Sequence, residues 1–342
     1  MTTTTTLPPL EPPTYEALER IRVIRNFTGY TSRGLRRWQR EVEAVEDVRI
    51  TSTADGAEQP ALWLPPRGDR PRPLLVVLHS WSAHYLQHAG IPYAMWAEDN
   101  GWAVIAPNYR GVNDDADSTG SDLAVQDAVD AIDWATAQDG VDADHVYTVG
   151  YSGGGMMSLL LAGRHPEKVA AAAAWGPPYD LVDFYRQARR QGRHYAWDLE
   201  RACGGNPTSD ADALASCVHR SPMAHLDAAR EFSVPVFIGQ GIWDTIVSPS
   251  QGARAFNQLA DPEDRFSDEQ VETFGRQRVP ESISQPVAAE SHFTDGDPGV
   301  VLARRSASVS LVYFRANHEM VYGASLRFFV DHLRNGQPPD PS

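Results

Sequence analysis

Six short aliphatic runs separated by helix-like segments leave few folds open to this chain. The runs have the length and composition of strands covered on both faces, and they span residues 74–78, 103–106, 146–149, 169–174, 234–238 and 309–314. Residues 121–137 carry Val125, Val129 and Ile132 at helical spacing. We expect the acidic residues of this helix (Asp122, Asp127, Asp130 and Asp133) to point toward water. Strands and helices in alternation predict an α/β fold, with a mostly parallel central sheet and helices on both faces.

The pattern divides the chain into three parts. We expect a disordered tail at residues 1–13, a helical extension at 14–45 and the α/β domain at 46–335. Two antiparallel strands, 48–53 and 60–64, open this domain around a turn at Asp55-Gly56. Residues 177–231 are too long for a simple connection and are predicted to form a lid. Residues 261–305 are polar and are expected to be an irregular surface excursion.

Composition narrows the class of protein and its surroundings. The chain has 42% hydrophobic and 22% charged residues, a composition typical of folded soluble proteins. No stretch approaches the roughly 20 apolar residues of a membrane span. A formal net charge of -15 argues against nucleic acid as a partner. The N-terminus lacks the pattern of a secretory signal, so we expect a cytoplasmic location and free thiols at Cys203 and Cys217. The oligomeric state stays open.

A glycine-rich turn between a strand and a helix predicts the nucleophile. Gly150-Tyr151-Ser152-Gly153-Gly154 has the form Gly-x-Ser-x-Gly, after the run at 146–149 and before a helical segment. Small neighbours let the strand and helix approach each other closely, while the sharp turn presents the serine at the helix N-terminus. We therefore predict Ser152 as a nucleophile, with the Gly153 N–H stabilising negative charge on the substrate oxygen.

A serine hydroxyl needs a base, and the base needs an orienting acid. Around a turn of this kind the acid and the histidine follow the serine in that order, after late strands. Asp244 follows the run at 234–238, and His318 follows the last run at 309–314. We predict Asp244 as the acid and His318 as the base, with Asp180, which also follows a strand, as an alternative acid.

The loop after the first buried run is expected to complete the site. His79-Ser80-Trp81-Ser82 stands where esterases carry His-Gly-Gly-Gly, so the second oxyanion donor is the N–H of Trp81 or Ser80, with Trp81 preferred. Aromatic residues next to strand ends suggest a substrate pocket for an acyl group. The residues expected to line it are Trp81, Tyr85, Tyr151, Trp175 and Trp243. No cofactor and no metal ion are expected.

These segments resemble the α/β-hydrolase superfamily over about residues 48–333, and within it the catalytic domain of prolyl-oligopeptidase-type serine hydrolases. The acidic helix, residues 141–146, the Gly-x-Ser-x-Gly-Gly turn and Asn108-Tyr109-Arg110-Gly111 are similar to that group. The resemblance implies that Arg110 anchors a loop near the active site. The 45 residues ahead of the domain in the printed sequence are too few for the β-propeller of the peptidases, which favours an ester or a small amide over a peptide as the substrate.

Together these features predict a serine hydrolase that forms an acyl-enzyme intermediate on a small-molecule acyl substrate. Two other enzymes could use the same triad: an acyltransferase or cyclase, in which the acceptor is not water, and an aminopeptidase-like peptidase. A non-catalytic binding protein is a further alternative, against which the ordered serine, aspartate and histidine argue.

Overall fold

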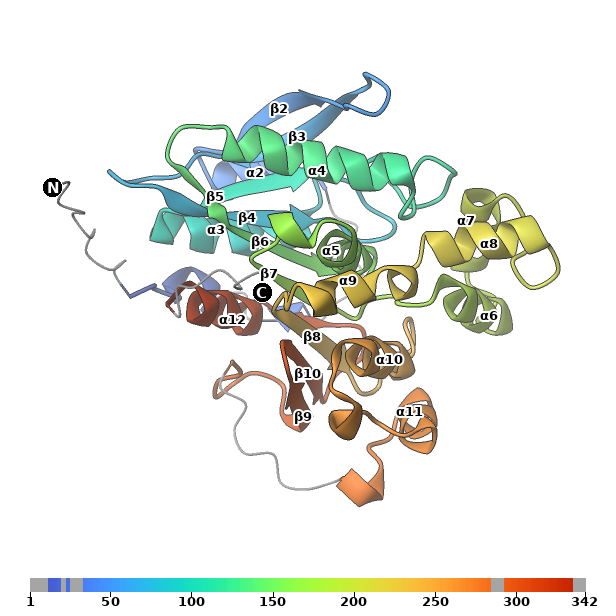
Figure 1. The fold of residues 1–342 in the computed structure, drawn as a ribbon. Helices are drawn as coiled ribbons and strands as arrows, with labels where there is room; N and C mark the ends of the chain where they lie inside the picture. The colour runs from blue at the N-terminus through green and yellow to red at the C-terminus, as the bar shows by residue number, and fades with distance from the viewer. Residues whose placement is uncertain (1–11, 20–22, 25–32, 284–291, 335–342) are drawn as a thin grey trace, which may run out of the picture.

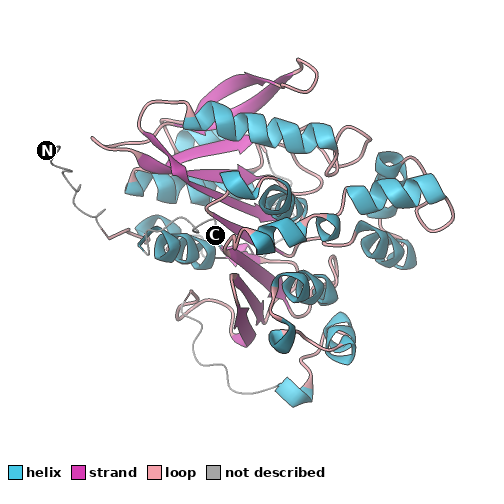
Figure 2. Ribbon diagram, viewed as in Figure 1, coloured by secondary structure: helices cyan, strands magenta, loops and turns pink. Residues whose placement is uncertain are grey.

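The computed structural model describes residues 12–19, 23–24, 33–283 and 292–334. A nine-stranded sheet forms its centre (Figures 1 and 2). In spatial order the strands are β2 (Glu46–Thr51), β3 (Glu58–Leu64), β5 (Ala103–Pro107), β4 (Arg72–Leu78), β6 (Val141–Tyr151), β7 (Ala171–Trp175), β8 (Val236–Gly241), β10 (Val309–Phe314) and β9 (Val300–Ser306). The strands from β5 to β10 pair in parallel, while β2, β3 and β9 run antiparallel to their neighbours. The predicted mostly parallel sheet is confirmed.

Helices cover both faces of the sheet (Figure 1). The α-helices are α2 (Leu35–Glu41), α3 (Ile91–Asn100), α4 (Asp122–Thr136), α5 (Gly153–Arg164), α6 (Leu181–Gln191), α7 (Tyr195–Cys203), α8 (Ala211–His219), α9 (Leu226–Glu231), α10 (Pro249–Leu259), α11 (Asp268–Gly275) and α12 (Tyr322–Arg334). Short 3-10 helices are η1 (Glu16–Leu18), η2 (His88–Gly90), η3 (Pro166–Lys168), η4 (Pro222–Ala224), η5 (Pro262–Asp264) and η6 (Glu281–Ile283).

The aliphatic runs are continuous because each strand is buried on both sides. In β4, Leu74 and Val76 belong to the core under α4, α5 and α10, while Leu75 and Val77 belong to the core under α3 and α12. Successive side chains of a strand point to opposite faces, so both must be apolar here. The two cores fix the sheet between its helix layers.

Helix α4 departs from the expectation that all its acidic residues face water. Ser121 caps the helix by accepting a hydrogen bond from the Ala124 N–H, as serine commonly does at this position. Asp127 and Asp130 are buried, and Asp130 accepts hydrogen bonds from the backbone and hydroxyl of Thr53. The expectation is wrong for these two residues because that side of α4 faces the polar turn between β2 and β3.

The ends and insertions differ in part from the expected organisation. The expected tail at 1–13 falls mainly outside the described residues. The expected helical extension at 14–45 contains, in its described part, η1, α2 and the short strand β1 (Val23–Ile24), which pairs with β11 (Met320–Val321). The segment 261–305 is not wholly irregular: it includes α11, which starts with a capping box at Ser267 and Gln270, and β9, which pairs with β10.

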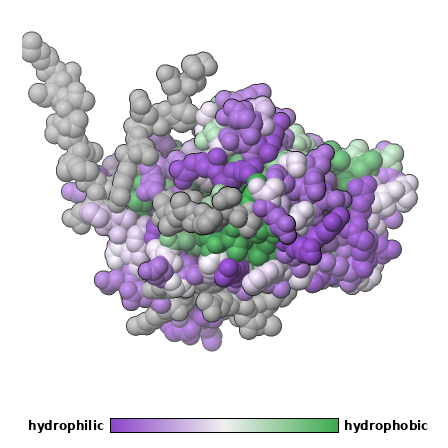
Figure 3. Space-filling view, turned by 90° about the horizontal axis from the view of Figure 1, so that it is seen from below, coloured by the Kyte–Doolittle hydropathy of each residue, from purple (hydrophilic) through white to green (hydrophobic). Residues whose placement is uncertain are grey.

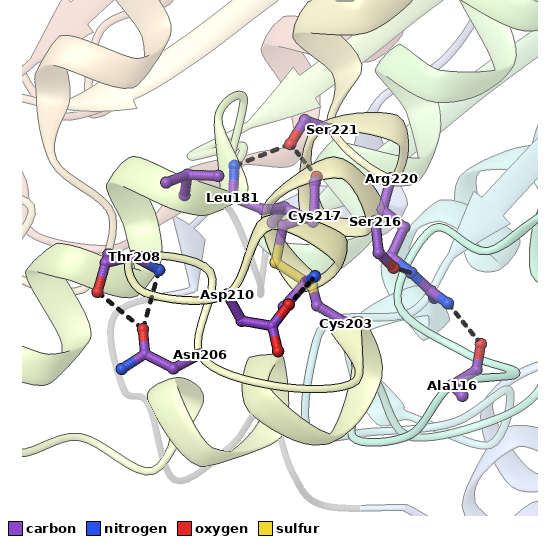
Figure 4. The surroundings of a disulfide bond; sticks show 12 residues. Ala116, Leu181, Cys203, Asn206, Thr208, Asp210, Ser216, Cys217, Arg220 and Ser221 are labelled. Carbon is purple, nitrogen blue, oxygen red and sulfur yellow. Dashed lines mark hydrogen bonds between the residues drawn. A yellow bond between two sulfur atoms is a disulfide. The ribbon is translucent and has the colours of Figure 1, made fainter.

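The insertion at 177–231 folds into α6, α7, α8 and α9, beside the sheet (Figure 1). Cys203 at the end of α7 forms a disulfide with Cys217 in α8 (Figure 4). The expectation of free thiols is therefore wrong. It rested on compartment alone, whereas the packing of α7 against α8 brings the two Cα atoms to 5.3 Å.

The surface is largely polar. The face drawn in Figure 3 is mainly hydrophilic, with a hydrophobic area near its centre. Among the described residues, no helix combines the length and the apolar character that a membrane crossing requires.

Candidate active site

Ser152 sits at a sharp turn between β6 and α5. Its backbone has a φ of 57° and a ψ of -117°, a conformation that residues other than glycine rarely adopt. Its N–H donates a hydrogen bond of 2.7 Å to the Trp175 carbonyl at the end of the neighbouring strand β7. The turn predicted from the sequence is therefore present, and it holds Ser152 at the carboxyl end of the parallel strands.

The glycines around Ser152 are required by close packing of backbones. A Cβ at Gly150 would lie 2.1 Å from the carbonyl carbon and oxygen of Gly154. A Cβ at Gly154 would lie 2.2 Å from the carbonyl oxygen of Leu78 in β4. Both distances are shorter than any contact between non-bonded atoms, so only glycine fits and helix α5 can start directly against the sheet.

Asp244 and His318 form a buried pair. Asp244 lies in the loop after β8 and His318 in the loop after β10, and the His318 Nδ1 is 2.6 Å from the Asp244 Oδ2. The Asp244 Oδ2 also accepts a hydrogen bond from the Gln240 side chain, and its Oδ1 accepts from the Ile246 and Val247 N–H groups. These donors stabilise the carboxylate and fix its orientation toward the imidazole.

The segment that carries Ser152 lies directly against His318. The ring of Tyr151 is 4.6 Å from the His318 ring, and the Tyr151 hydroxyl donates a 2.8 Å hydrogen bond to the His318 carbonyl. On the other side, a Cβ at Gly176 would lie 3.1 Å from the His318 ring, and Gly176 follows Trp175, whose carbonyl binds the Ser152 N–H. Tyr151 in the serine turn and Gly176 after β7 therefore both lie against the His318 ring.

The alternative acid, Asp180, has another role. Its Oδ1 accepts hydrogen bonds from the Val182 and Asp183 N–H groups, so Asp180 caps the N-terminus of α6. Asp244 is the carboxylate bonded to His318.

Two backbone amides meet beside Ser152. A Cβ at Gly153 would lie 2.7 Å from the Trp81 nitrogen, so these two stretches of backbone are in contact. In the described part of the chain, neither the Trp81 nor the Gly153 N–H donates a hydrogen bond to another residue. Amide donors left available next to a nucleophile can bind a developing oxyanion. The Ser80 N–H instead donates to the Gln87 side chain, which removes the alternative donor.

His79 supports this loop. Its ring stacks on Tyr109 at 3.9 Å, and its Nε2 and Nδ1 lie 2.7 Å and 3.1 Å from the carbonyl oxygens of Asn108 and Ser80. Burial lowers the pKa of His79 to about 4, so the ring is neutral near pH 7. His79 thus ties the loop after β4, which carries Trp81, to the loop after β5.

Comparisons with known proteins agree with this geometry. The model of the prolyl oligopeptidase family matches residues 92–274, which is more than half of the chain. The chain belongs to the prolyl oligopeptidase family. Dipeptidyl aminopeptidase BIII of Pseudoxanthomonas mexicana is 26% identical over 194 residues, covering 54% of this chain and 27% of that protein. The putative esterase NocK of Nocardia uniformis subsp. tsuyamanensis is 36% identical over 110 residues, covering 30% and 32%.

The solved structures support the same fold. A puromycin-hydrolyzing peptidase of Mycobacterium tuberculosis superposes with a TM-score of 0.55 at 17% identity, covering 87% of this chain and 40% of that one. At this identity the likeness shows the fold alone, which is that of the α/β-hydrolases. The matches reach only about a third of the length of the two curated relatives. Membership of the prolyl oligopeptidase family, with both peptidases and esterases among its relatives, supports a hydrolase.

Arg110, which carried part of the resemblance to the prolyl oligopeptidase family, links three elements. Its guanidinium donates two hydrogen bonds to Asp127 of α4, at 2.6 Å and 3.1 Å, and two to Asp55 in the turn between β2 and β3, at 2.8 Å and 2.9 Å. These bonds lower the pKa of Asp55 to about 2. Arg110 therefore anchors the loop after β5, which carries the Asn108 carbonyl bonded to His79.

The aromatic residues predicted to line a substrate pocket lie in different surroundings. The Trp175 ring is fully buried against Phe237 and Phe314, and is therefore a core residue. Tyr151 packs on His318, as described. The Tyr85 hydroxyl donates to Asp47, at 3.2 Å. Trp243, next to Asp244, is 50% exposed.

Sequence reasoning missed two lid residues at the site. Phe184 of α6 and Tyr195 of α7 lie edge-on to the buried Trp81 ring, at 5.6 Å and 6.0 Å. Burial raises the pKa of Tyr195 to about 12, and the negative charge of Asp244 adds to the shift. The apolar face of α6 directly after β7 was the available signal for Phe184. Tyr195 had none, because only the fold of the lid brings α7 over the loop that carries Trp81.

Proposed function

We propose that this chain is a serine hydrolase that cleaves an ester or a small amide with Ser152, His318 and Asp244. The observation that carries the proposal is the buried 2.6 Å bond between His318 and Asp244, with the serine turn packed against the imidazole. A carboxylate that binds one imidazole nitrogen leaves the other nitrogen as the proton acceptor, which is the arrangement a serine nucleophile needs.

The reaction proceeds through an acyl-enzyme. His318 takes the proton of the Ser152 hydroxyl as the oxygen attacks the acyl carbon, and Asp244 stabilises the imidazolium that forms. The tetrahedral oxyanion is bound by the N–H groups of Trp81 and Gly153. His318 then protonates the leaving alcohol or amine, and the acyl group stays on Ser152. A water molecule, deprotonated by His318, attacks the acyl carbon; the bond to the Ser152 oxygen breaks, His318 returns the proton to Ser152, and the acid is released.

The substrate class is the finer part of the proposal. Named relatives include both a peptidase and a putative esterase, and the matched segments are shorter than either protein. We favour a small acyl substrate because the lid helices α6 and α7 pack Phe184 and Tyr195 on the ring of Trp81, over the loop after β4 that carries Trp81 (residues 79–82, the oxyanion loop). Aminopeptidase-like cleavage and acyl transfer to an acceptor other than water use the same residues and are the competing outcomes.

Location is a separate expectation. The cytoplasmic location inferred from the sequence stays a prediction, and the disulfide between Cys203 and Cys217 weighs against it, because disulfides persist mainly in oxidising compartments.

A substrate panel tests the proposal. p-Nitrophenyl esters of increasing acyl chain length and aminoacyl p-nitroanilides are assayed with the wild-type chain, with Ser152→Ala, and with Ser209→Ala as a matched control at an exposed serine. We expect turnover of the short esters to exceed that of the anilides, to vanish in Ser152→Ala and to persist in Ser209→Ala. Turnover of anilides alone would favour the peptidase alternative, and added amine that captures the acyl group would favour transfer. Full ester turnover by Ser152→Ala would refute the mechanism.

A further inference from the structure

Trp81 joins the lid to the oxyanion hole. Its backbone contacts Gly153, while its side chain is buried and points away into the insertion, between Phe184 of α6 and Tyr195 of α7. The Trp81 carbonyl accepts hydrogen bonds from the backbone and side chain of Asn113, at 2.9 Å and 3.3 Å. One residue thus has its backbone at the nucleophile and its indole held by the lid.

The polar end of the indole has one partner in α7. The Trp81 Nε1–H donates a 3.2 Å hydrogen bond to the Asp198 Oδ2. Asp198 is nearly buried, and its other oxygen accepts a 2.8 Å bond from Arg201, which also donates to the Asp114 carbonyl at 2.8 Å. His194 lies 3.6 Å from Asp198 and 3.4 Å from the Ser82 hydroxyl. Helix α7 therefore contacts the oxyanion loop through several polar groups centred on one carboxylate.

The Asp198 carboxyl is buried, and its polar partners include the Trp81 indole. Burial raises the pKa of its carboxyl, against the stabilising effects of His194, Trp81 and Arg201. An indole N–H left unpaired in the same place would also cost free energy. The indole N–H and the Asp198 carboxyl are therefore each other's hydrogen-bond partner. This bond holds the side-chain torsions of Trp81, and so constrains the position of the Trp81 backbone.

The position of α7 is itself fixed. Cys203, the last residue of α7, is bonded to Cys217 of α8 (Figure 4). Just beyond α8, Arg220 donates hydrogen bonds to the carbonyls of Ser118 and Ala116, and Ser221 accepts one from the Leu181 N–H. The disulfide thereby connects the helix that carries Asp198 to a helix attached to the main domain.

We infer that Asp198 is a positioning residue, which holds the Trp81 indole so that the Trp81 N–H faces the oxyanion formed at Ser152. The inference rests on the proposed hydrolase function and adds a contribution of the lid to transition-state stabilisation. An interaction made at the oxyanion acts on kcat with little effect on KM.

The test measures kcat and KM with the p-nitrophenyl ester that the wild-type chain hydrolyses fastest. Asp198→Ala should lower kcat by about tenfold, a fraction of the roughly 10²- to 10³-fold cost of deleting an oxyanion donor, with KM changed by less than about twofold. Asp198→Asn keeps an acceptor for the indole and should stay within about threefold of wild type. Asp212→Asn, at an exposed aspartate of α8, is the matched control and should leave both constants unchanged.

Trp81→Phe keeps the buried ring but removes the indole N–H, so it should reproduce the loss in kcat even if Asp198→Ala does not fold. The double variant should be no slower than either single variant, because both remove the same bond. An unchanged kcat in Trp81→Phe, a rise in KM alone, or losses that multiply in the double variant would overturn the inference. Ser152→Ala, measured beside them, separates the two proposals: full ester turnover there would refute the proposed mechanism at Ser152, whatever Asp198 does.

Discussion

At position 152 the backbone is held in a conformation that serine rarely adopts, and its neighbours determine whether that is possible. The strain is maintained by the bond from the Ser152 N–H to Trp175 and by the contact of Gly150 with Gly154. The serine hydroxyl is therefore placed by backbone packing around it. Adding a methyl group at Gly150 or Gly154 should therefore reduce activity more than adding one at a glycine far from Ser152.

Gly150→Ala tests this packing. The added Cβ would lie 2.1 Å from the Gly154 carbonyl, so β6 and α5 must separate, and we expect a loss of at least about 2 kcal/mol in the free energy of unfolding together with loss of ester hydrolysis. Gly275→Ala is the control, because its nearest neighbour would be 3.6 Å away. Urea denaturation measures the stability and an ester assay measures the activity. If Gly150→Ala were as stable as Gly275→Ala, the backbone of the turn would accommodate a Cβ and the packing argument would be wrong.

His79 should make stability depend on pH. Its pKa is about 4 in the folded chain and about 6.5 when unfolded, so the unfolded state binds more protons between these values. The contribution is present above pH 6.5 and is lost as the pH falls, by about 2 kcal/mol between pH 7 and pH 5. His79→Gln cannot titrate and should lose less stability over that interval. The measurement is the free energy of unfolding in urea at pH 7 and pH 5 for both proteins. If the wild-type chain and His79→Gln lost the same amount between the two pH values, this role of His79 would be contradicted.

At the scale of elements, Arg110 joins the turn between β2 and β3, the loop after β5 and helix α4. Asp127 is buried, and burial raises the pKa of its carboxyl even in the presence of Arg110. Arg110→Met should therefore leave a buried charge without its partner and cost about 3 kcal/mol in the free energy of unfolding. Adding Asp127→Asn should recover part of that loss. A double variant less stable than Arg110→Met would show that the pair is not the source of the cost.

The elements also show what the sequence could and could not predict. The aliphatic runs predicted the parallel strands, because a strand buried on both faces must be apolar throughout. The order of Ser152, Asp244 and His318 after three strands of the parallel sheet, β6, β8 and β10, predicted a candidate site, because parallel strands bring their carboxyl ends to one edge of the sheet. Periodicity could not place Asp127 and Asp130 in the interior, since their partners Arg110 and Thr53 are distant in sequence. The contacts of α7 with Trp81 were hidden for the same reason.

At the scale of the whole molecule, the lid is attached to the α/β domain at both of its ends and cross-linked between α7 and α8. Without reductant, both cysteines should be unreactive toward a thiol reagent in denaturant, and both should react after reduction. Closing a loop of this length stabilises a chain by about 3 kcal/mol, so reduction should lower the melting temperature. The Cys203→Ser, Cys217→Ser double variant should be insensitive to reductant. Two reactive thiols in the unreduced protein would contradict the cross-link.

The most direct test of the convergence of Ser152, His318 and Asp244 is labelling with a fluorophosphonate probe, followed by peptide mass spectrometry. The wild-type chain should be labelled at Ser152, and His318→Ala, which removes the base, should be labelled far more slowly while keeping its fold by circular dichroism. Absence of label, label at another serine, or equal labelling rates in the two proteins would show that these side chains do not act together.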